Sequence, residues 1–98
     1  MDITKTIDDT AMTIALSGRL DTTTAPELEE AINADIAGKT RLDLDFAGLD
    51  YLSSAGLRVL LAAQKTMNVQ GEMVLHNVNE LVNEVFEVTG FIDILTIE

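Results

Sequence analysis

Two adjacent serines have the clearest chemical potential in this sequence. Ser53 and Ser54 stand directly before Ala55–Met67, a segment rich in helix-forming residues. A serine at a helix start lies near backbone N–H groups that lack partners within the helix, and these groups favour an anion. A phosphate on Ser54 would change the surface charge by about −1.5 to −2 without requiring the domain to unfold. The alternative is that Ser53 or Ser54 is only an N-cap, which position alone favours.

A second polar run, Asp21-Thr22-Thr23-Thr24, precedes another predicted helix. Thr24 can cap that helix, and Glu27, three residues later, would complete a capping box. Asp21 then has two interpretations. It belongs to a binding surface near the serine pair, or it only orders the loop before the cap. The same two interpretations hold for Thr22 and Thr23.

Arg58 falls in the first turn of the helix that follows the serines. The positive end of the helix dipole disfavours a cation at this point. The arginine therefore has three interpretations: it compensates for nearby acidic residues, it contacts a partner, or it is a solvated surface residue, which is the commonest case.

Other residue patterns argue against an enzyme. A catalytic serine is disfavoured because there is no Gly-x-Ser-x-Gly elbow and His76 is the single histidine. Gly48 and Gly56 fit neither the Walker nor the dinucleotide-binding pattern. Asp43 and Asp45 alternate with apolar residues, which predicts a solvated strand face. With no cysteine, a thiolate metal site is excluded, and one histidine excludes a multi-histidine site. We expect no enzyme activity, no cofactor and no metal.

The amino-acid composition argues against several classes of partner and location. The chain has 98 residues, with 6 Lys or Arg against 17 Asp or Glu, which gives a net charge of −11. Nucleic acids and anionic membranes both require clustered basic residues, so neither is an expected partner. No apolar run approaches the roughly 18 residues of a membrane span, so membrane insertion is not expected. The acidic N-terminus does not resemble a signal peptide, and we expect an intracellular protein.

Hydrophobic periodicity predicts the elements that position these residues. Alternation of apolar and polar residues predicts strands, and apolar residues at helical spacing predict helices. The predicted strands are Ile3–Ile7, Ala11–Ser17, Arg41–Phe46, Met73–Leu75 and Phe91–Ile97. The predicted helices are Ala25–Ala37, Ala55–Met67 and a third that carries Leu81, Val82, Val85 and Phe86, starts at Asn77 or Asn79 and ends at Gly90.

The predicted order is β-β-α-β-α-β-α-β, which is an α/β class with parallel pairing and right-handed crossovers. Ligands and partners of such sheets meet the loops at the carboxyl ends of the strands. Both polar segments, Gly18–Thr24 and Leu49–Leu57, occupy such loops. We therefore expect the two segments to lie near each other. The periodicity alone leaves open whether helices cover one face of the sheet or both.

Three segments resemble one known family. Leu16–Asp21 is similar to its Gly-x-Leu-Asp turn, Leu42–Phe46 to one of its strands, and Tyr51–Leu61 to its Asp-Ser-Ser/Thr-Gly-Leu motif. Over essentially its whole length the chain thus resembles the STAS family of sulphate-transporter and anti-sigma-factor-antagonist domains. The sequence departs from the motif at Ser53, where many members have Asp, at Ala55, where they have Ser or Thr, and at Arg58, where they have Gly.

The resemblance implies a single STAS domain over residues 1–98, with a small, mostly parallel sheet and helices packed largely on one face. Stand-alone members are cytoplasmic anti-sigma factor antagonists. Unphosphorylated, they bind an anti-sigma factor that is also a serine kinase, and the sigma factor is released. The kinase phosphorylates a serine that matches Ser54, the antagonist dissociates, and a phosphatase restores it.

The resemblance also implies a partner-binding surface. Leu52 and Leu57 each belong either to that surface or to the core, and we favour the surface for Leu52 and the core for Leu57. Ser53 remains an alternative phosphate acceptor. The alternative function is a constitutive STAS adaptor that docks on a transporter ATPase, with Ser54 only a helix cap. The implied surface consists of Asp21, Thr22, Thr23, Leu52, Ser53, Ser54, Gly56 and Arg58.

Overall fold

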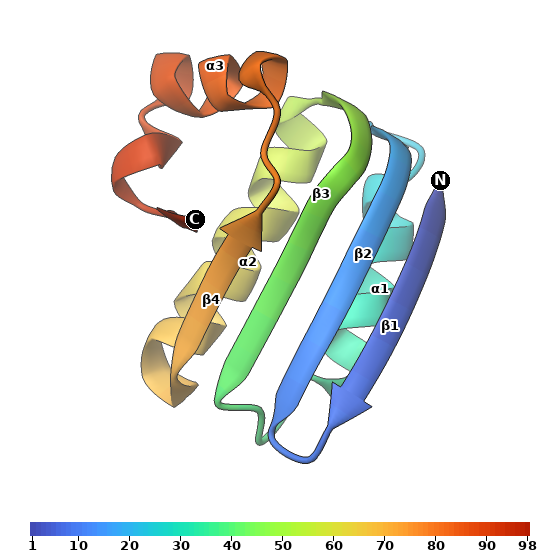
Figure 1. Ribbon diagram of the computed structural model, residues 1–98, viewed down its shortest axis with the longest axis vertical. Helices are drawn as coiled ribbons and strands as arrows, with labels where there is room; N and C mark the ends of the chain where they lie inside the picture. Colours follow the sequence, from blue (N-terminus) through green and yellow to red (C-terminus); the bar gives the residue numbers. More distant parts are fainter.

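Five strands form one sheet, and three helices accompany it, in the computed structural model, which describes residues 1–98 (Figure 1). In chain order the elements are β1 (Asp2–Asp8), β2 (Ala11–Leu20), α1 (Ala25–Asp35), β3 (Arg41–Leu52), α2 (Ser54–Gln70), β4 (Glu72–His76), α3 (Glu80–Thr89), a 3₁₀ turn (Phe91–Asp93) and β5 (Thr96–Ile97).

The sheet has the strand order β1-β2-β3-β4-β5. A tight turn joins β1 to β2, which pair antiparallel, and Asp9 takes the left-handed conformation there with φ of 54°. All later pairs are parallel, each reached through a helical connection or the 3₁₀ turn. The predicted α/β class with a mostly parallel sheet is therefore confirmed.

Helices α1 and α2 lie together on one face of the sheet, and α3 lies beyond the end of β4 (Figure 1). Alternate residues of the central strands, such as Met12 and Ile14 in β2 and Leu42 and Leu44 in β3, point towards the helices and are fully buried. This packing confirms that the helices are largely on one face. None of the helices is both long and apolar enough to cross a membrane.

The opposite face of the sheet carries a polar network. Arg41 Nη2 donates to Asp43 Oδ1 at 2.9 Å, and Arg41 Nη1 to Glu72 Oε2 at 2.9 Å. His76 Nε2 lies 2.7 Å from Asp43 Oδ1. Burial raises the pKa of Asp43, but the hydrogen bonds from Arg41 and His76 outweigh it, and the pKa lies below its usual value. Asp43 thus lies on the face opposite Leu42, as its alternation predicts.

Three strands differ from prediction by more than one residue at an end. We expected β2 to end at Ser17 and β3 at Phe46, but pairing continues to Leu20 and Leu52. Two shifts in register interrupt the regular alternation, and Gly18 allows one of them because its φ is +104°. The sequence period is lost at such a bulge, although the strands continue.

The third difference is at the C-terminus, where we predicted one strand over Phe91–Ile97. Phe91–Asp93 is instead a 3₁₀ turn, closed by Ile94 N donating to Phe91 O at 2.9 Å, and only the residues of β5 pair with β4. Gly90 ends α3 in the left-handed conformation, as predicted.

The helices also differ from prediction by a few residues at their ends. α1 ends at Asp35 rather than Ala37, and α2 runs from Ser54 to Gln70 rather than from Ala55 to Met67. Asn79 caps α3 by accepting a hydrogen bond from Val82 N at 2.8 Å. Asn79 was one of the two predicted caps, and Asn77 was the other.

Candidate functional site

The two polar segments meet at one end of the sheet. Leu20 and Leu52 are paired residues at the ends of β2 and β3, and Ser53 N donates to Leu20 O at 2.9 Å. From this point one segment turns into α1 and the other into α2, so both helices begin at the same edge (Figure 1). The prediction that these segments lie near each other is confirmed.

Asp21 orders the turn before α1. Its Oδ1 accepts hydrogen bonds from Thr23 Oγ1 at 2.8 Å, Thr23 N at 3.0 Å and Thr24 N at 3.1 Å. The bond from the Thr23 hydroxyl is the largest cause of the lowered pKa of Asp21. Because these bonds stabilise the ionised carboxylate, the turn is held in one conformation at neutral pH.

The predicted capping box of Thr24 and Glu27 is wrong. The Thr24 side chain makes no capping bond to α1. Its hydroxyl donates to Arg19 O at 2.6 Å and accepts from Asp21 N at 2.8 Å. The hydroxyl is thus used within the turn, while Glu27 N donates to the backbone oxygen of Thr24 at 2.9 Å instead.

The two serines differ sharply in accessibility. Ser53 is the N-cap residue of α2 by position, but its hydroxyl oxygen is buried and has no hydrogen-bond partner. Ser54 is the first residue of α2 and is exposed. Ser53 therefore holds the N-cap position that the alternative interpretation gave to one of the two serines, but its side chain makes no capping hydrogen bond. The residue that a second protein can reach is Ser54.

Leu52 and Gly56 lie beneath this surface rather than on it. Leu52 is 5% exposed and belongs to the hydrophobic core, which corrects our placement of Leu52 on the partner surface. Gly56 is also buried, and a Cβ there would lie 2.7 Å from both Leu20 Cγ and Leu52 Cδ1. Both residues therefore support the surface from below. Leu57 is buried, as we predicted.

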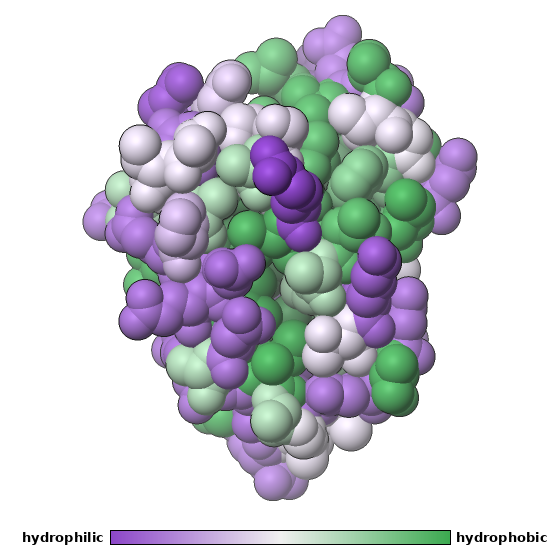
Figure 2. All heavy atoms as spheres, turned by 180° about the vertical axis from the view of Figure 1, so that it is seen from behind, coloured by the Kyte–Doolittle hydropathy of each residue, from purple (hydrophilic) through white to green (hydrophobic).

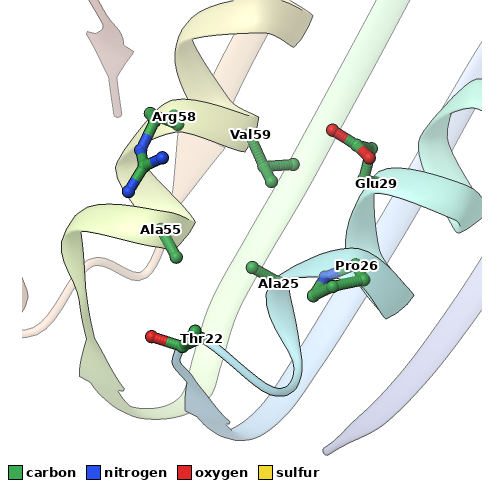
Figure 3. Close-up of a pocket in the computed structure, with 7 residues that line it drawn as sticks. All are labelled: Thr22, Ala25, Pro26, Glu29, Ala55, Arg58 and Val59. Carbon is green, nitrogen blue, oxygen red and sulfur yellow. The ribbon is translucent and has the colours of Figure 1, made fainter.

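A shallow groove separates the first turns of α1 and α2 (Figure 3). Arg58 lies on its α2 side and Glu29 on its α1 side, and no ion pair joins them. Seen from behind the sheet, the helix-bearing face shows apolar residues through its middle, with strongly hydrophilic side chains lying over some of them (Figure 2). The full lining of the groove is Thr22, Ala25, Pro26, Glu29, Ala55, Arg58 and Val59.

One pair of residues at this edge, a cation and an aromatic ring, was not predicted from the sequence. The Arg19 guanidinium lies 4.1 Å from the centre of the Tyr51 ring, and its Nε lies 3.8 Å from Asp21 Oδ2. Arg19 and Tyr51 are register partners in β2 and β3. The two shifts in register bring them together, and the periodicity of either strand alone gives no signal of this.

Neither a cluster of metal-binding side chains nor the single histidine is found at this edge. The structure has no group of three or more His, Cys, Asp or Glu side chains arranged to hold a metal ion. His76 lies on the other face of the sheet, in the network with Asp43, as a hydrogen-bonding residue at a strand end. The single histidine is therefore not at the edge where Ser54 lies.

Comparison with known sequences identifies relatives over nearly the whole chain. A family model described as "Mlab, STAS domain" matches residues 3–96. The provisionally named anti-sigma factor antagonist BtrV of Bordetella bronchiseptica is 40% identical over 99 residues, covering 99% of this chain and 85% of that protein. The anti-sigma-B factor antagonist of Listeria monocytogenes is 32% identical over 87 residues, covering 87% and 76%.

The fold is shared with a solved antagonist. Unphosphorylated SpoIIAA aligns with a TM-score of 0.78 at 19% identity, covering 99% of this chain and 87% of that chain. The phosphorylated form of SpoIIAA from Bacillus gives 0.77 at 20% identity, covering 99% and 91%. These structures agree with the fold, and the family model spans almost every residue. The chain belongs to the STAS domain family.

Proposed function

We propose that this protein is an anti-sigma factor antagonist whose binding is switched off by phosphorylation of Ser54. Unphosphorylated, it binds an anti-sigma factor that is also a serine kinase, and the sigma factor is released. The observation that carries the proposal is the exposed Ser54 at the start of α2, beside the ordered Asp21 turn. The names of the sequence relatives support the same function.

We call the proposed contact area the switch surface. It contains the members of the surface expected from the sequence that are exposed or partly exposed as residues, and it omits the buried Leu52 and Gly56. Its backbone is held by the Asp21 turn and by the end of the β2–β3 pairing, so little ordering is needed on binding. The switch surface consists of Asp21, Thr22, Thr23, Ser53, Ser54 and Arg58.

Ser54 rather than Ser53 is the proposed phosphate acceptor. The Ser53 hydroxyl oxygen is buried, so a kinase could reach it only if the start of α2 opened. Ser54 is exposed without any such change. In the proposed step, Ser54 Oγ attacks the γ-phosphorus of ATP bound to the kinase. The hydroxyl proton is released to a base of the kinase, and ADP leaves.

The phosphorylated protein would keep its fold and lose its partner. The first N–H groups of α2 receive no side-chain cap and tolerate an anion nearby. A partner that covers the switch surface would have to desolvate a charge of about −1.5 to −2, which is costly because it exceeds the charge of any single cation beside it. SpoIIAA, which shares this fold, is known in both phosphorylated and unphosphorylated forms, and this supports the proposal.

The remaining partners follow from this cycle. A phosphatase would remove the phosphate from Ser54 and restore binding. We propose that the protein acts in the cytoplasm, where sigma factors direct transcription, as a single domain that has no enzyme activity and needs no cofactor.

Partner capture from a native cell lysate tests the proposal. The baits are wild type, Ser54→Ala, Ser54→Glu and the control Ser17→Glu, which adds the same charge at an exposed residue of β2. We expect wild type, Ser54→Ala and Ser17→Glu to retain an anti-sigma factor and Ser54→Glu to lose it. The captured protein, given ATP, should phosphorylate wild type at Ser54 and leave Ser54→Ala unmodified.

Retention of the same partner by all four baits, with no phosphate on Ser54, would contradict the switch. The protein would then be a constitutive adaptor. Semisynthetic phosphoserine at position 54 completes the comparison, because glutamate carries less charge than phosphate.

A further inference from the structure

Arg58 differs from the other two arginines of the chain. Arg41 is paired with Asp43 and Glu72, and Arg19 lies within 3.8 Å of Asp21. Arg58 is exposed and forms no ion pair or side-chain hydrogen bond. It is therefore the one guanidinium in this strongly acidic protein that has no acidic partner.

The helix places this free guanidinium one turn after Ser54. Side chains four residues apart on an α-helix are neighbours, with Cβ atoms about 5–6 Å apart. Helical side chains also lean towards the N-terminus of their helix. Figure 3 shows the Arg58 guanidinium directed back along α2, towards its first turn. A group attached to Ser54 Oγ thus lies within reach of Arg58.

The charge of Arg58 has no local compensation in the unmodified protein. The first turn of α2 contains no acidic residue, and this end of the helix dipole repels a cation. Glu29 lines the same groove but belongs to α1 and makes no ion pair with Arg58. An anion added at Ser54 would remove this mismatch.

We propose that Arg58 is the counter-ion of phosphoserine at position 54. The planar guanidinium donates two parallel N–H bonds to phosphate oxygens, the geometry in which arginine binds phosphate most strongly. The proposal rests on Ser54 being the modified residue. It adds a second consequence of phosphorylation, because pairing draws Arg58 from the groove onto the first turn of α2. The partner then loses a cationic contact as well as meeting a new negative charge.

Phosphorus NMR of a protein with genetically encoded phosphoserine at position 54 tests this pairing without any kinase. The second ionisation of phosphoserine has a pKa of about 6. Arg58 stabilises the dianion more than the monoanion, so Arg58→Ala should raise that pKa by roughly 0.15–0.7 units. Arg58→Lys should give an intermediate value, because lysine keeps the charge but lacks the planar fork.

Lys65→Ala is the matched control, since Lys65 is an exposed cation of α2 that lies far from its first turn. This variant should titrate like wild type, and the effect of Arg58→Ala should shrink in high salt. Identical titrations for wild type, Arg58→Ala and Lys65→Ala would overturn the proposal. The titration needs no partner. A shift of the phosphoserine pKa in Arg58→Ala would therefore support the pairing even if phosphorylation leaves partner binding unchanged. Conversely, loss of binding on phosphorylation would support the switch even if the pKa does not shift.

Discussion

Two polar regions of this molecule use similar residues in opposite ways. On the uncovered face of the sheet, Arg41, Asp43, Glu72 and His76 contact one another. At the switch surface, the carboxylate of Asp21 accepts hydrogen bonds from its own turn. Ser54 and Arg58 are exposed, and neither side chain forms a hydrogen bond or an ion pair. The comparison indicates that mutual pairing accompanies a structural role. Exposed polar side chains that form no hydrogen bond or ion pair within the protein, on an ordered backbone, are the ones available for modification and binding.

The largest expected effect on stability comes from the residue that supports the switch surface from below. Glycine to alanine in an open helix position stabilises by up to about 1 kcal/mol. Gly56→Ala should instead destabilise by about 1–3 kcal/mol, because the new Cβ would meet Leu20 and Leu52 at 2.7 Å. Chemical denaturation measures the difference in the free energy of unfolding between wild type and Gly56→Ala. A stabilised variant would contradict the prediction, because it would show that Leu20 and Leu52 can move aside without cost.

The network on the sheet face should matter for stability and not for binding. Asp43→Asn should cost about 0.5–1.5 kcal/mol at pH 7, because Arg41 and His76 lose an ionised partner while Arg41 keeps Glu72. Affinity for the anti-sigma factor should stay unchanged. Asp50→Asn is the control, since Asp50 is exposed and makes no ion pair. A loss of binding in Asp43→Asn would contradict the claim that the sheet-face network stabilises the fold without taking part in binding.

The same substitution has a predicted pH dependence. The pKa of Asp43 in the folded protein lies below its ordinary value of 3.8, because the hydrogen bonds from Arg41 and His76 outweigh the effect of burial. Its contribution to stability is therefore fully present above the unfolded-state pKa and is lost as the pH falls through the folded-state pKa. The difference in unfolding free energy between wild type and Asp43→Asn should shrink in acid. A constant difference from neutral pH down into acid would contradict this.

The smallest of these effects concerns the turn before α1. Asp21→Ala removes the acceptor of three hydrogen bonds, so the turn should become mobile and partner binding should weaken several-fold. Asp21→Asn keeps one acceptor oxygen and should retain much of the affinity. Calorimetric titration with the anti-sigma factor measures both variants. Equal affinities for wild type and Asp21→Ala would remove Asp21 from the switch surface.

The regular parts of the fold follow from the sequence because one local pattern dominates them. Strict alternation over Arg41–Phe46 places Leu42 and Leu44 in the core and Asp43 on the opposite face. Asn79 and Gly90 bound α3 through local backbone chemistry, and both were predicted. These features depend on neighbours within a few residues, which is why a sequence pattern is sufficient to predict them.

The switch surface was harder to predict because it depends on contacts between segments. The register shifts between β2 and β3 extend both strands and bring Arg19 over Tyr51. Burial of the Ser53 hydroxyl and of Leu52 follows from packing that periodicity does not encode. The position of Ser54 at a helix start was predicted, but its freedom from any capping bond required the structure.

The most direct test of the central claim is the affinity of the purified anti-sigma factor for this protein with and without phosphoserine at position 54. Phosphoserine at position 17, on the sheet and away from the switch surface, is the control. We predict that phosphoserine 54 weakens binding by at least about 30-fold, because the partner would bury a phosphate whose charge one arginine only partly offsets, and that phosphoserine 17 leaves it unchanged. Equal affinities for the unmodified and phosphoserine 54 proteins would contradict the account.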